Sequence, residues 1–335
     1  MNVWGLAASA GMEAQVRALA EALNLDVQMK EAEVKPPFVW LPNSAYAAGL
    51  SKFVIPHLLA EGSDGFSPPW PDVVISCGRR PAMVAMGLQS SLRAQRSNPE
   101  LDRHGSSSLA MTKFIHIQDP HVSPKHFDVV VAMQHDAITG NNVIKTQYAL
   151  HSITQEKLWA AQAKFQPIFA NYPKPYISVL LGGSTNKYKL TLTAMQEVIT
   201  KLRAIQTTTT GTLLITVSRR TGENNTRILK EVFGDNQRVH IYDGIGENPY
   251  MGMLALADSI FVTNDSVNMM SEAAATGKPL YILPLAGHTN TKPSCFADGL
   301  INTGVAHIWT GSWDGWSYNA ADEMRQLAER IRAIL

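Results

Sequence analysis

Short apolar runs alternate along the chain with stretches in which apolar residues recur every three or four positions. The runs are rich in Val, Ile and Leu, as is typical of strands that are covered on both faces of a parallel sheet. They lie at residues 3–7, 73–76, 114–117, 129–132, 177–181, 213–217, 239–242, 260–263, 280–283 and 305–309. Most of the stretches between them have the period of helices with one buried face. The alternation predicts an α/β fold with doubly wound sheets.

A proline-containing connection marks the domain boundary. Residues 171–176 read Asn-Tyr-Pro-Lys-Pro-Tyr, and the two prolines cannot continue a helix and stiffen the backbone. We therefore expect a first domain over residues 1–170 and a second over residues 175–317, with about five strands in each.

One segment breaks the alternation. Residues 89–111 are polar and rich in serine, and they lie between a predicted helix and the strand at 114–117. Such a stretch adds little apolar surface and is easily lengthened. The pattern predicts a surface loop inserted into the first domain.

Composition and charge narrow the class of protein. The chain has 335 residues, of which 45% are hydrophobic and 17% charged, and its net charge is +1. These values predict a soluble globular protein and give no reason to expect a nucleic-acid partner. With Cys77 and Cys295 as its two cysteines and no charged-then-apolar leader, the sequence predicts a cytoplasmic protein without a Cys-based metal site. No uninterrupted apolar run approaches the ~18 residues of a membrane span, which leaves only peripheral contact with the inner membrane open.

The segment 264–279, reading NDSVNMMSEAAATGKP after an apolar run, carries the strongest chemical signal. Asp265 and Ser266 are favoured helix N-cap residues, and the helix start that continues through Val267 attracts anions. Glu272 follows about two turns later and could accept hydrogen bonds from ribose hydroxyls. The segment predicts a nucleotide-diphosphate site. The alternative is an ordinary strand–helix–strand unit in which Glu272 is merely solvated.

Two further motifs of the second domain follow apolar runs, where parallel sheets place their ligands. After 177–181 come two glycines and a serine, which let a ligand approach the backbone closely. After 213–217 comes Ser-Arg-Arg-Thr, and an arginine fork suits a diphosphate. The predicted nucleotide-binding residues are Gly182, Gly183, Ser184, Ser218, Arg219, Arg220, Asp265, Ser266, Val267 and Glu272.

Similar motifs follow the runs of the first domain. Glycine and paired arginines at 78–80 follow the run at 73–76, Asp119 follows the run at 114–117, and His135 comes soon after the run at 129–132. Each motif alone is weak, because a glycine after a strand is usually a turn and paired arginines are usually solvated. Their recurrence at equivalent positions favours a second ligand-binding edge.

Several strings, taken in order, resemble the mitochondrial-fission ELM-like family over nearly the whole chain except 89–111. They are S-x-G-R-R at 76–80, I-Q-D-P at 117–120, F-D-x-V-V at 127–131, H-D at 135–136, G-x-N-V-I at 140–144, G-G-S at 182–184, S-R-R-T at 218–221, N-P-Y-x-G-x-L-A-x-A-D at 248–258 and T-x-D-S-V-x-M-x-S-E-A at 263–273. That family in turn resembles GT-B glycosyltransferases, which have two Rossmann-like domains facing across a cleft. The resemblance implies a nucleotide sugar in the second domain with Glu272 on its ribose. It also implies a last helix, about 318–335, that packs back on the first domain.

The resemblance implies acceptor binding by the first domain, through Gly11, Gln15, Gly78, Arg79 and Arg80. The family's turn after the first strand resembles G-K-x-G-x-x-x-Q, and residues 8–15 keep only its second glycine and its glutamine. The acceptor is unknown. A lipid-linked acceptor is one option, because the loop 36–50 carries Phe38, Trp40, Leu41 and Tyr46; such aromatic residues more often pack beneath a loop.

A transferase of this kind would need no cofactor besides the nucleotide sugar and, without a D-x-D motif, no metal. The diphosphate leaving group would be stabilised by helix N–H groups and the residues at 218–220. The candidates for the general base are Glu13, Asp119 and His135, although His135 beside Asp136 is equally well read as a structural pair. Two alternatives stay open: a non-catalytic adaptor, as plant relatives are for a dynamin-like protein, and a sugar-nucleotide epimerase on the same fold.

Overall fold

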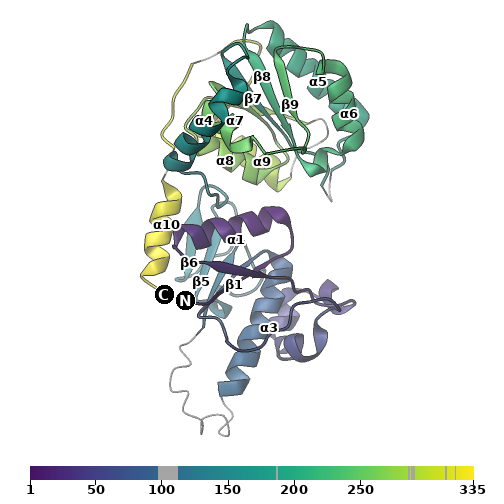
Figure 1. Ribbon diagram of the computed structural model, residues 1–335. Coiled ribbons are helices and arrows are strands. Elements are labelled where there is room, and N and C mark those ends of the chain that lie inside the picture. Colours follow the sequence, from purple (N-terminus) through teal and green to yellow (C-terminus); the bar gives the residue numbers. More distant parts are fainter. Residues whose placement is uncertain (97–111, 186–187, 286, 288–290, 314, 321) are drawn as a thin grey trace. The chain divides into compact units, whose positions relative to one another are not determined.

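The computed structural model describes the chain except for residues 97–111, 186–187, 286, 288–290, 314 and 321 (Figure 1). The chain divides into two compact units. Unit 1 comprises Met1–Ser152 together with Asp322–Leu335, and unit 2 comprises Ile153–Ala321. Each unit contains a six-stranded sheet in which all neighbouring strands are parallel.

The sheet of unit 1 has the order β2-β1-β3-β4-β5-β6. Its strands are β1 (Val3–Ala7), β2 (Val27–Lys30), β3 (Val73–Cys77), β4 (Lys113–Ile117), β5 (Val129–Met133) and β6 (Val143–Thr146). The chain runs from β1 outward to β2, then returns to the other side of β1 and continues through β3 to β6. This reversal makes the sheet doubly wound.

Successive residues of the unit 1 strands face two different cores, as the two-residue period of a strand requires. One core contains Val73 and Ile75 with apolar residues of α1 (Ala10–Ala22) and α10 (Glu323–Arg332). The other contains Val74 with α3 (Arg79–Arg96). Against α3 pack α2 (Asn43–Ala47) and the short helical turns that follow it up to residue 58. The last helix thus belongs to the α1 face of unit 1.

The predicted loop at 89–111 is wrong for its first part. Residues 89–96 continue α3, which runs without interruption from Arg79 to Arg96. The serine and arginine residues there are compatible with a helix, and Leu88 and Leu92 keep its apolar stripe buried. Residues 97–111 lie outside the described residues.

The sheet of unit 2 has the order β12-β11-β10-β7-β8-β9. Its strands are β7 (Tyr176–Leu181), β8 (Thr212–Val217), β9 (Val239–Tyr242), β10 (Ser259–Thr263), β11 (Leu280–Leu283) and β12 (Ala306–Ile308). The chain winds from β7 through β8 to β9 and then resumes at β10 on the other side of β7. The strand order therefore reverses between β7 and β10, and such a reversal opens a crevice at the carboxyl ends of the two strands.

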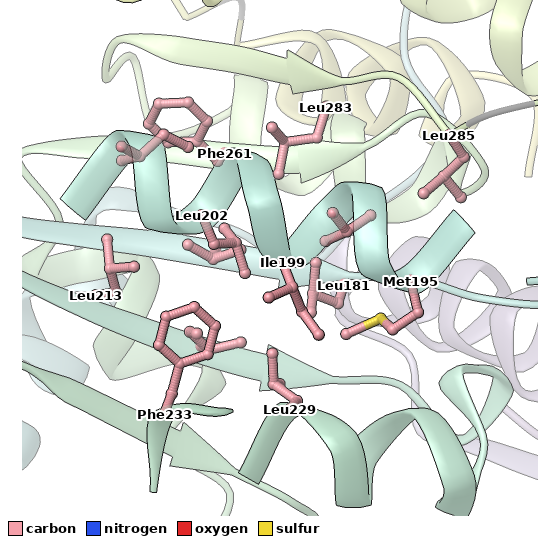
Figure 2. Packing of buried hydrophobic residues seen from close by; sticks show 14 of the residues in the cluster. Leu181, Met195, Ile199, Leu202, Leu213, Leu229, Phe233, Phe261, Leu283 and Leu285 are labelled. Atoms are coloured by element: carbon pink, nitrogen blue, oxygen red, sulfur yellow. The ribbon is translucent and has the colours of Figure 1, made fainter. Parts of the chain in front are cut away.

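Helices cover both faces of this sheet. On one face, Met195, Ile199 and Leu202 of α5 (Leu192–Thr207) pack onto apolar strand residues, among them Leu181 and Phe261 (Figure 2). The other helices of unit 2 are α4 (Gln155–Phe169), α6 (Glu223–Phe233), α7 (Tyr250–Leu256), α8 (Val267–Ala274) and α9 (Lys292–Asn302).

The division between the units lies earlier than the predicted boundary at 171–176. Unit 2 begins at Ile153, so α4 belongs to it. Phe165 and Phe169 of α4 join a buried cluster with Met253 of α7. The helices approach so closely that a Cβ on Gly252 would lie 2.4 Å from the Phe165 Cβ. This packing ties α4 to the second sheet, although the two prolines come after it in the chain.

The predicted fold class, two doubly wound parallel α/β domains, is confirmed. Each of the ten predicted runs lies on a strand of the structure. The two strands without a predicted run are β2 and β6, which are the edges of the unit 1 sheet. Their residues are mostly half-buried and mix polar with apolar side chains, reading VQMK and VIKT, so they lack a continuous apolar run. Among the helices that the structure describes, none is long and apolar enough to cross a membrane.

Candidate functional site

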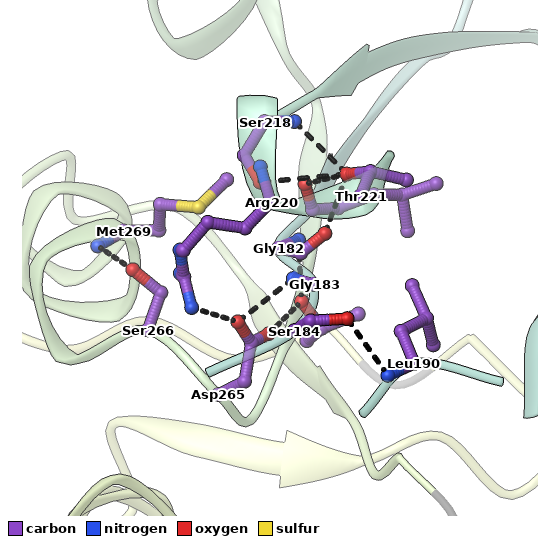
Figure 3. A network of polar contacts seen from close by, with 12 residues as sticks. Gly182, Gly183, Ser184, Leu190, Ser218, Arg220, Thr221, Asp265, Ser266 and Met269 are labelled. Atoms are coloured by element: carbon purple, nitrogen blue, oxygen red, sulfur yellow. Dashed lines mark hydrogen bonds and ion pairs between the residues drawn. The ribbon is translucent and has the colours of Figure 1, made fainter. Parts of the chain in front are cut away.

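The loops after β7 and β10 in unit 2 lie against each other at the reversal of the strand order. The Gly182 N–H donates to Oγ1 of Thr263 at 2.8 Å, and the Gly183 N–H donates to Oδ2 of Asp265 at 2.9 Å (Figure 3). Both loops therefore take their shape from hydrogen bonds between neighbouring strand ends. They bring the predicted glycine motif and the predicted helix start to one place.

Close packing explains why two glycines stand here. A Cβ on Gly182 would lie 2.1 Å from Oδ1 of Asp265. A Cβ on Gly183 would lie 2.1 Å from the backbone oxygen of Arg220. A side chain at 182 would displace the Asp265 carboxylate, and a side chain at 183 would displace the backbone at 220–221. The glycine motif thus has a structural role in addition to any contact with a ligand.

Asp265 and Arg220 form an ion pair where the loops after β7, β8 and β10 meet, a place that we call the junction. Arg220 Nη1 lies 2.9 Å from Asp265 Oδ2 (Figure 3), and the aspartate side chain is fully buried. The Thr263 hydroxyl donates to the other carboxylate oxygen at 2.7 Å. Each oxygen of Asp265 therefore has a donor within the protein. Asp265 supports the loops, and Arg220 is the partly exposed side of the pair.

The Ser-Arg-Arg-Thr motif after β8 is hydrogen-bonded to the glycine motif after β7. The Thr221 hydroxyl donates to the Gly182 carbonyl at 2.5 Å, and the Ser184 N–H donates to the Arg220 carbonyl at 2.8 Å. Ser218 caps the short turn at 219–221, because its hydroxyl accepts from the Arg220 N–H at 3.2 Å. Ser218 and the Arg220 side chain both remain partly exposed.

Helix α8 begins at this junction. Ser266 is its N-cap, with a hydroxyl that accepts from the Met269 N–H at 3.4 Å (Figure 3), and Val267 is its first residue. The first N–H groups of a helix have no acceptor within the helix, and the macrodipole adds partial positive charge there. The start of α8 can therefore receive an anionic oxygen beside the loop of Ser184.

Glu272, the sixth residue of α8, carries the carboxylate expected on a ribose. It is partly buried, and its Oε2 accepts a hydrogen bond from the Tyr250 hydroxyl at 2.5 Å. Burial raises the pKa of Glu272, and the bond from Tyr250 lowers it in part. The pKa of Tyr250 is raised well above its usual value, first by burial and then by the neighbouring carboxylate. The phenol thus keeps its proton and remains a donor.

Arg219 precedes Arg220 in the short turn after β8. It is exposed and lines a surface pocket of about 500 Å³. Arg227 and Lys230 of α6 also line this pocket. Lys230 pairs with Asp243, and its hydrogen bond is the main cause that lowers the pKa of Asp243. The pocket thus gathers three cationic side chains beside the motif that follows β8.

The predicted acceptor-side residues of unit 1 have mixed surroundings. The Arg79 guanidinium donates to the Leu41 carbonyl at 2.8 Å, whereas Arg80 lies 3.8 Å from Glu33 at the surface. Gly78 has a positive φ of 91°. Gly11 is exposed in the first turn of α1, and Gln15 is buried, with its Oε1 4.0 Å from the Cys77 sulfur. Arg80 and Gly11 are therefore open to solvent, and Gln15 is part of the packing.

The three candidates for the general base all lie at the carboxyl edge of the unit 1 sheet. Glu13 forms a solvent-exposed ion pair with Arg17 at 2.7 Å. Asp119 accepts from the His121 N–H at 2.7 Å, which shapes the loop after β4. His135 Nε2 lies 3.8 Å from the buried carboxylate of Asp136. No group of three or more His, Cys, Asp or Glu side chains placed to hold a metal ion occurs within the described residues.

Comparison with known proteins decides the family. The model of the family described as "Mitochondrial fission ELM1" matches residues 10–335. The chain belongs to this family. The mitochondrial fission protein ELM1 of Arabidopsis thaliana is 31% identical over 291 residues, which cover 79% of this chain and 64% of the plant protein. The uncharacterized protein RP120 of Rickettsia prowazekii (strain Madrid E) is 28% identical over 291 residues, covering 79% of this chain and 80% of that protein.

Solved structures place this ELM1-family chain among proteins with the GT-B-like fold. The UDP-GlcNAc 2-epimerase of Methanocaldococcus jannaschii has a TM-score of 0.54 and 12% identity, covering 99% of this chain and all of the epimerase chain. MnaA of S. aureus, solved with UDP, also has a TM-score of 0.54 and 12% identity. The match covers 99% of this chain and 88% of the MnaA chain. At this level of identity the likeness shows the fold.

For this ELM1-family chain, the structure brings together most of the residues that sequence reasoning assigned to the nucleotide side. Sequence reasoning missed one residue that contacts Glu272. Tyr250 follows Pro249 at the start of α7 and contacts Glu272 from 22 residues away in the sequence. Its motif, N-P-Y at 248–250, is one of the strings that resemble the family, but the sequence alone suggested no chemical role for it. The structure shows the role, because the Tyr250 hydroxyl donates to the Glu272 carboxylate.

Proposed function

We propose that unit 2 binds the nucleoside diphosphate of a nucleotide sugar and that the protein is a GT-B-type glycosyltransferase. The observation that carries the proposal is the position of Glu272. Its carboxylate is desolvated and lies six residues beyond Ser266, which caps α8. A phosphate at the helix start and a ribose at Glu272 would be about 9 Å apart along the helix axis. A nucleoside diphosphate offers both groups.

The charges around α8 support a diphosphate. The macrodipole and the first N–H groups favour an anion at Ser266. The partly exposed guanidinium of Arg220 lies in the same junction, and exposed Arg219 follows the same strand. In a transfer these groups would stabilise the negative charge that develops on the leaving diphosphate, the task that falls to a metal in other transferases.

Unit 1 would supply the acceptor and the base. In the transfer, the bond between the anomeric carbon and the diphosphate oxygen breaks, and a new bond forms to an acceptor hydroxyl oxygen. The base takes the proton of that hydroxyl. Among Glu13, Asp119 and His135, the histidine has the ordinary pKa nearest to neutral pH.

The surface of unit 1 supports an acceptor with a lipid portion, met at a membrane surface. Trp40 is 71% exposed and Phe53 is 52% exposed. Both lie in the helical segment between residues 38 and 58 that packs on α3. Tryptophan at a surface suits the boundary between lipid and water.

A second candidate function is that of a binding protein without catalysis. It is favoured by one observation: Asp265 and the Oε2 atom of Glu272 already have partners within the protein. A fold that is complete without a ligand can serve as an adaptor. The name of the Arabidopsis relative, a mitochondrial fission protein, agrees with such a role.

Calorimetry with UDP, GDP, ADP and their sugars tests the proposal. Glu272→Ala should weaken binding of the preferred nucleotide by about 1.5–3 kcal/mol, which is the range for a hydrogen bond to a charged group. Glu197→Ala, which removes an exposed acid of α5 in the same unit, should leave the affinity unchanged. If the wild type binds no nucleotide at any accessible concentration, the adaptor becomes the better conclusion. Conversion of a nucleotide sugar into an isomer without an acceptor would show an epimerase instead.

A further inference from the structure

We infer that Tyr250 is a positioning residue for Glu272, an inference that rests on the proposed function. By donating its hydroxyl to Oε2, Tyr250 orients the carboxylate so that Oε1 faces a single ribose hydroxyl. Recognition of the ribose would then depend on one of its two hydroxyls and not on both. Tyr250 itself need not contact the nucleotide.

The backbone around Tyr250 is well placed to hold the ring still. The Tyr250 N–H donates to Oδ1 of Asn248 at 3.0 Å, and the Met253 N–H donates to the Pro249 carbonyl at 2.8 Å. Helix α7 is fixed in turn by fully buried Met253 and by the close approach of Gly252 to α4. The phenol oxygen therefore reaches Glu272 from a rigid element, as an orienting group must.

When Glu272 is ionised, the pair has one assignment of donor and acceptor. A phenol whose pKa is raised keeps its proton, so Tyr250 donates and the carboxylate accepts. Hydrogen bonds to an ionised acceptor are about twice as strong as those between neutral groups. With Oε2 engaged in this bond, Oε1 is the carboxylate oxygen that keeps both of its lone pairs for a ligand, so we expect a ribose hydroxyl to donate to Oε1.

The hydrogen bond also favours the ionised form of Glu272. Burial raises the pKa of the carboxyl, and the Tyr250 hydroxyl opposes that rise. Helices α7 and α8 and strand β10 carry no other charged residue. Helix α9, which packs on α8, carries Lys292 and Asp298. Without the tyrosine hydroxyl the pKa of Glu272 would rise further, and protonation would remove the acceptor at a higher pH.

The test compares the full-length wild type with Tyr250→Phe and Glu272→Ala, using UDP and its 2′-deoxy and 3′-deoxy forms at several pH values. We expect the wild type to bind one deoxy form about 10- to 150-fold more weakly than UDP and the other nearly as well, because one hydrogen bond to a charged group is lost. Tyr250→Phe should reduce that difference and shift the acid limit of UDP binding to higher pH. Tyr318→Phe is the matched control, because its hydroxyl donates to the Ala274 carbonyl at the end of the same helix.

The outcomes separate this inference from the proposed function. If both deoxy forms lose affinity equally, or if Tyr250→Phe keeps the preferences and pH profile of the wild type, Tyr250 is only structural. Tighter binding by Tyr250→Phe would mean that the phenol occupies the ribose position, which also overturns the inference. If Glu272→Ala binds every nucleotide as well as the wild type does, the proposed site itself fails.

Discussion

At the residue scale, His116 gives unit 1 a marked sensitivity to acid. The side chain is fully buried, its Nδ1 lies 2.8 Å from the Ser76 hydroxyl, and its ring stacks on Phe127. Burial lowers the pKa of His116 to about 3. In the unfolded chain the ordinary pKa is about 6.5, so between these values the unfolded state binds a proton that the folded state does not. Stability therefore falls as the pH drops through this window.

Each such histidine contributes a slope of up to about 1.4 kcal/mol per pH unit. His116→Asn should reduce the slope of the free energy of unfolding against pH by the contribution of one histidine. It should do so even if it lowers the stability at neutral pH. The free energy of unfolding of the wild type and the variant is measured at several pH values by denaturant unfolding. Hydrogen exchange of the β3 and β4 amides reports the same quantity locally. His57→Asn at an exposed position should keep the slope of the wild type. An unchanged slope in His116→Asn would mean that His116 is protonated in the folded protein.

The residues of the nucleotide side show what sequence could and could not predict. The pattern of Ser266, Glu272 and the two glycines was visible because helix starts and strand ends have local signals. The buried pairing of Asp265 with Arg220 was not, because it joins residues 45 positions apart in sequence that only the parallel neighbours β7, β8 and β10 bring together. The role of Tyr250 could not be predicted either, because Tyr250 and Glu272 are 22 residues apart in the sequence and only the fold brings them into contact.

At the scale of elements, helix α10 stabilises unit 1 although it comes last in the chain. Leu327, Ala328 and Ile331 are buried in the core shared with α1. At its start, the Glu323 carboxylate accepts the N–H groups of Gln147 at 2.6 Å and Tyr148 at 3.0 Å, just after β6. The helix is thus held by its apolar face and by its first residue.

Ile331→Ala should lower the free energy of unfolding of unit 1 by about 2–5 kcal/mol, since it removes a fully buried side chain and leaves a cavity. Arg330→Ala on the exposed face of the same helix should change it by no more than about 0.5 kcal/mol. Hydrogen exchange in α1 and α10 reads out the local effect. Equal stability of the two variants would show that α10 contributes little to the core.

The strands that the apolar pattern missed are the two edges of the unit 1 sheet, whereas the edge strands β9 and β12 of unit 2 were predicted. The central strands of both sheets are nearly all apolar and show as continuous runs, whereas the edge strands β2 and β6 mix polar and apolar residues. An edge strand has one neighbour and a more open surface, so it needs no continuous apolar run. The extent of α3 was underestimated for a related reason, because a polar sequence can continue a helix that is already nucleated on a buried face.

At the scale of the whole molecule, composition and motif order were sufficient for the fold class, but not for the division between the units. Two prolines suggested a boundary at 171–176, yet the packing of α4 on α7 moves it to Ile153. Local stiffness in the backbone and the border of a hydrophobic core are different properties. Only the second decides which helix belongs to which unit.

Unit 2 should fold and bind nucleotide by itself. It contains its own six-stranded sheet and two buried clusters, and every residue proposed for the nucleotide lies within 153–321. We expect a fragment of these residues to bind the preferred nucleotide within about tenfold of the full chain's affinity, a difference of about 1.4 kcal/mol. Saturation at 100 times Kd should add about 2.7 kcal/mol to its stability. Because the candidate bases are all in unit 1, the fragment should transfer no sugar. A folded fragment that fails to bind, beside a full chain that does, would place part of the nucleotide site in unit 1.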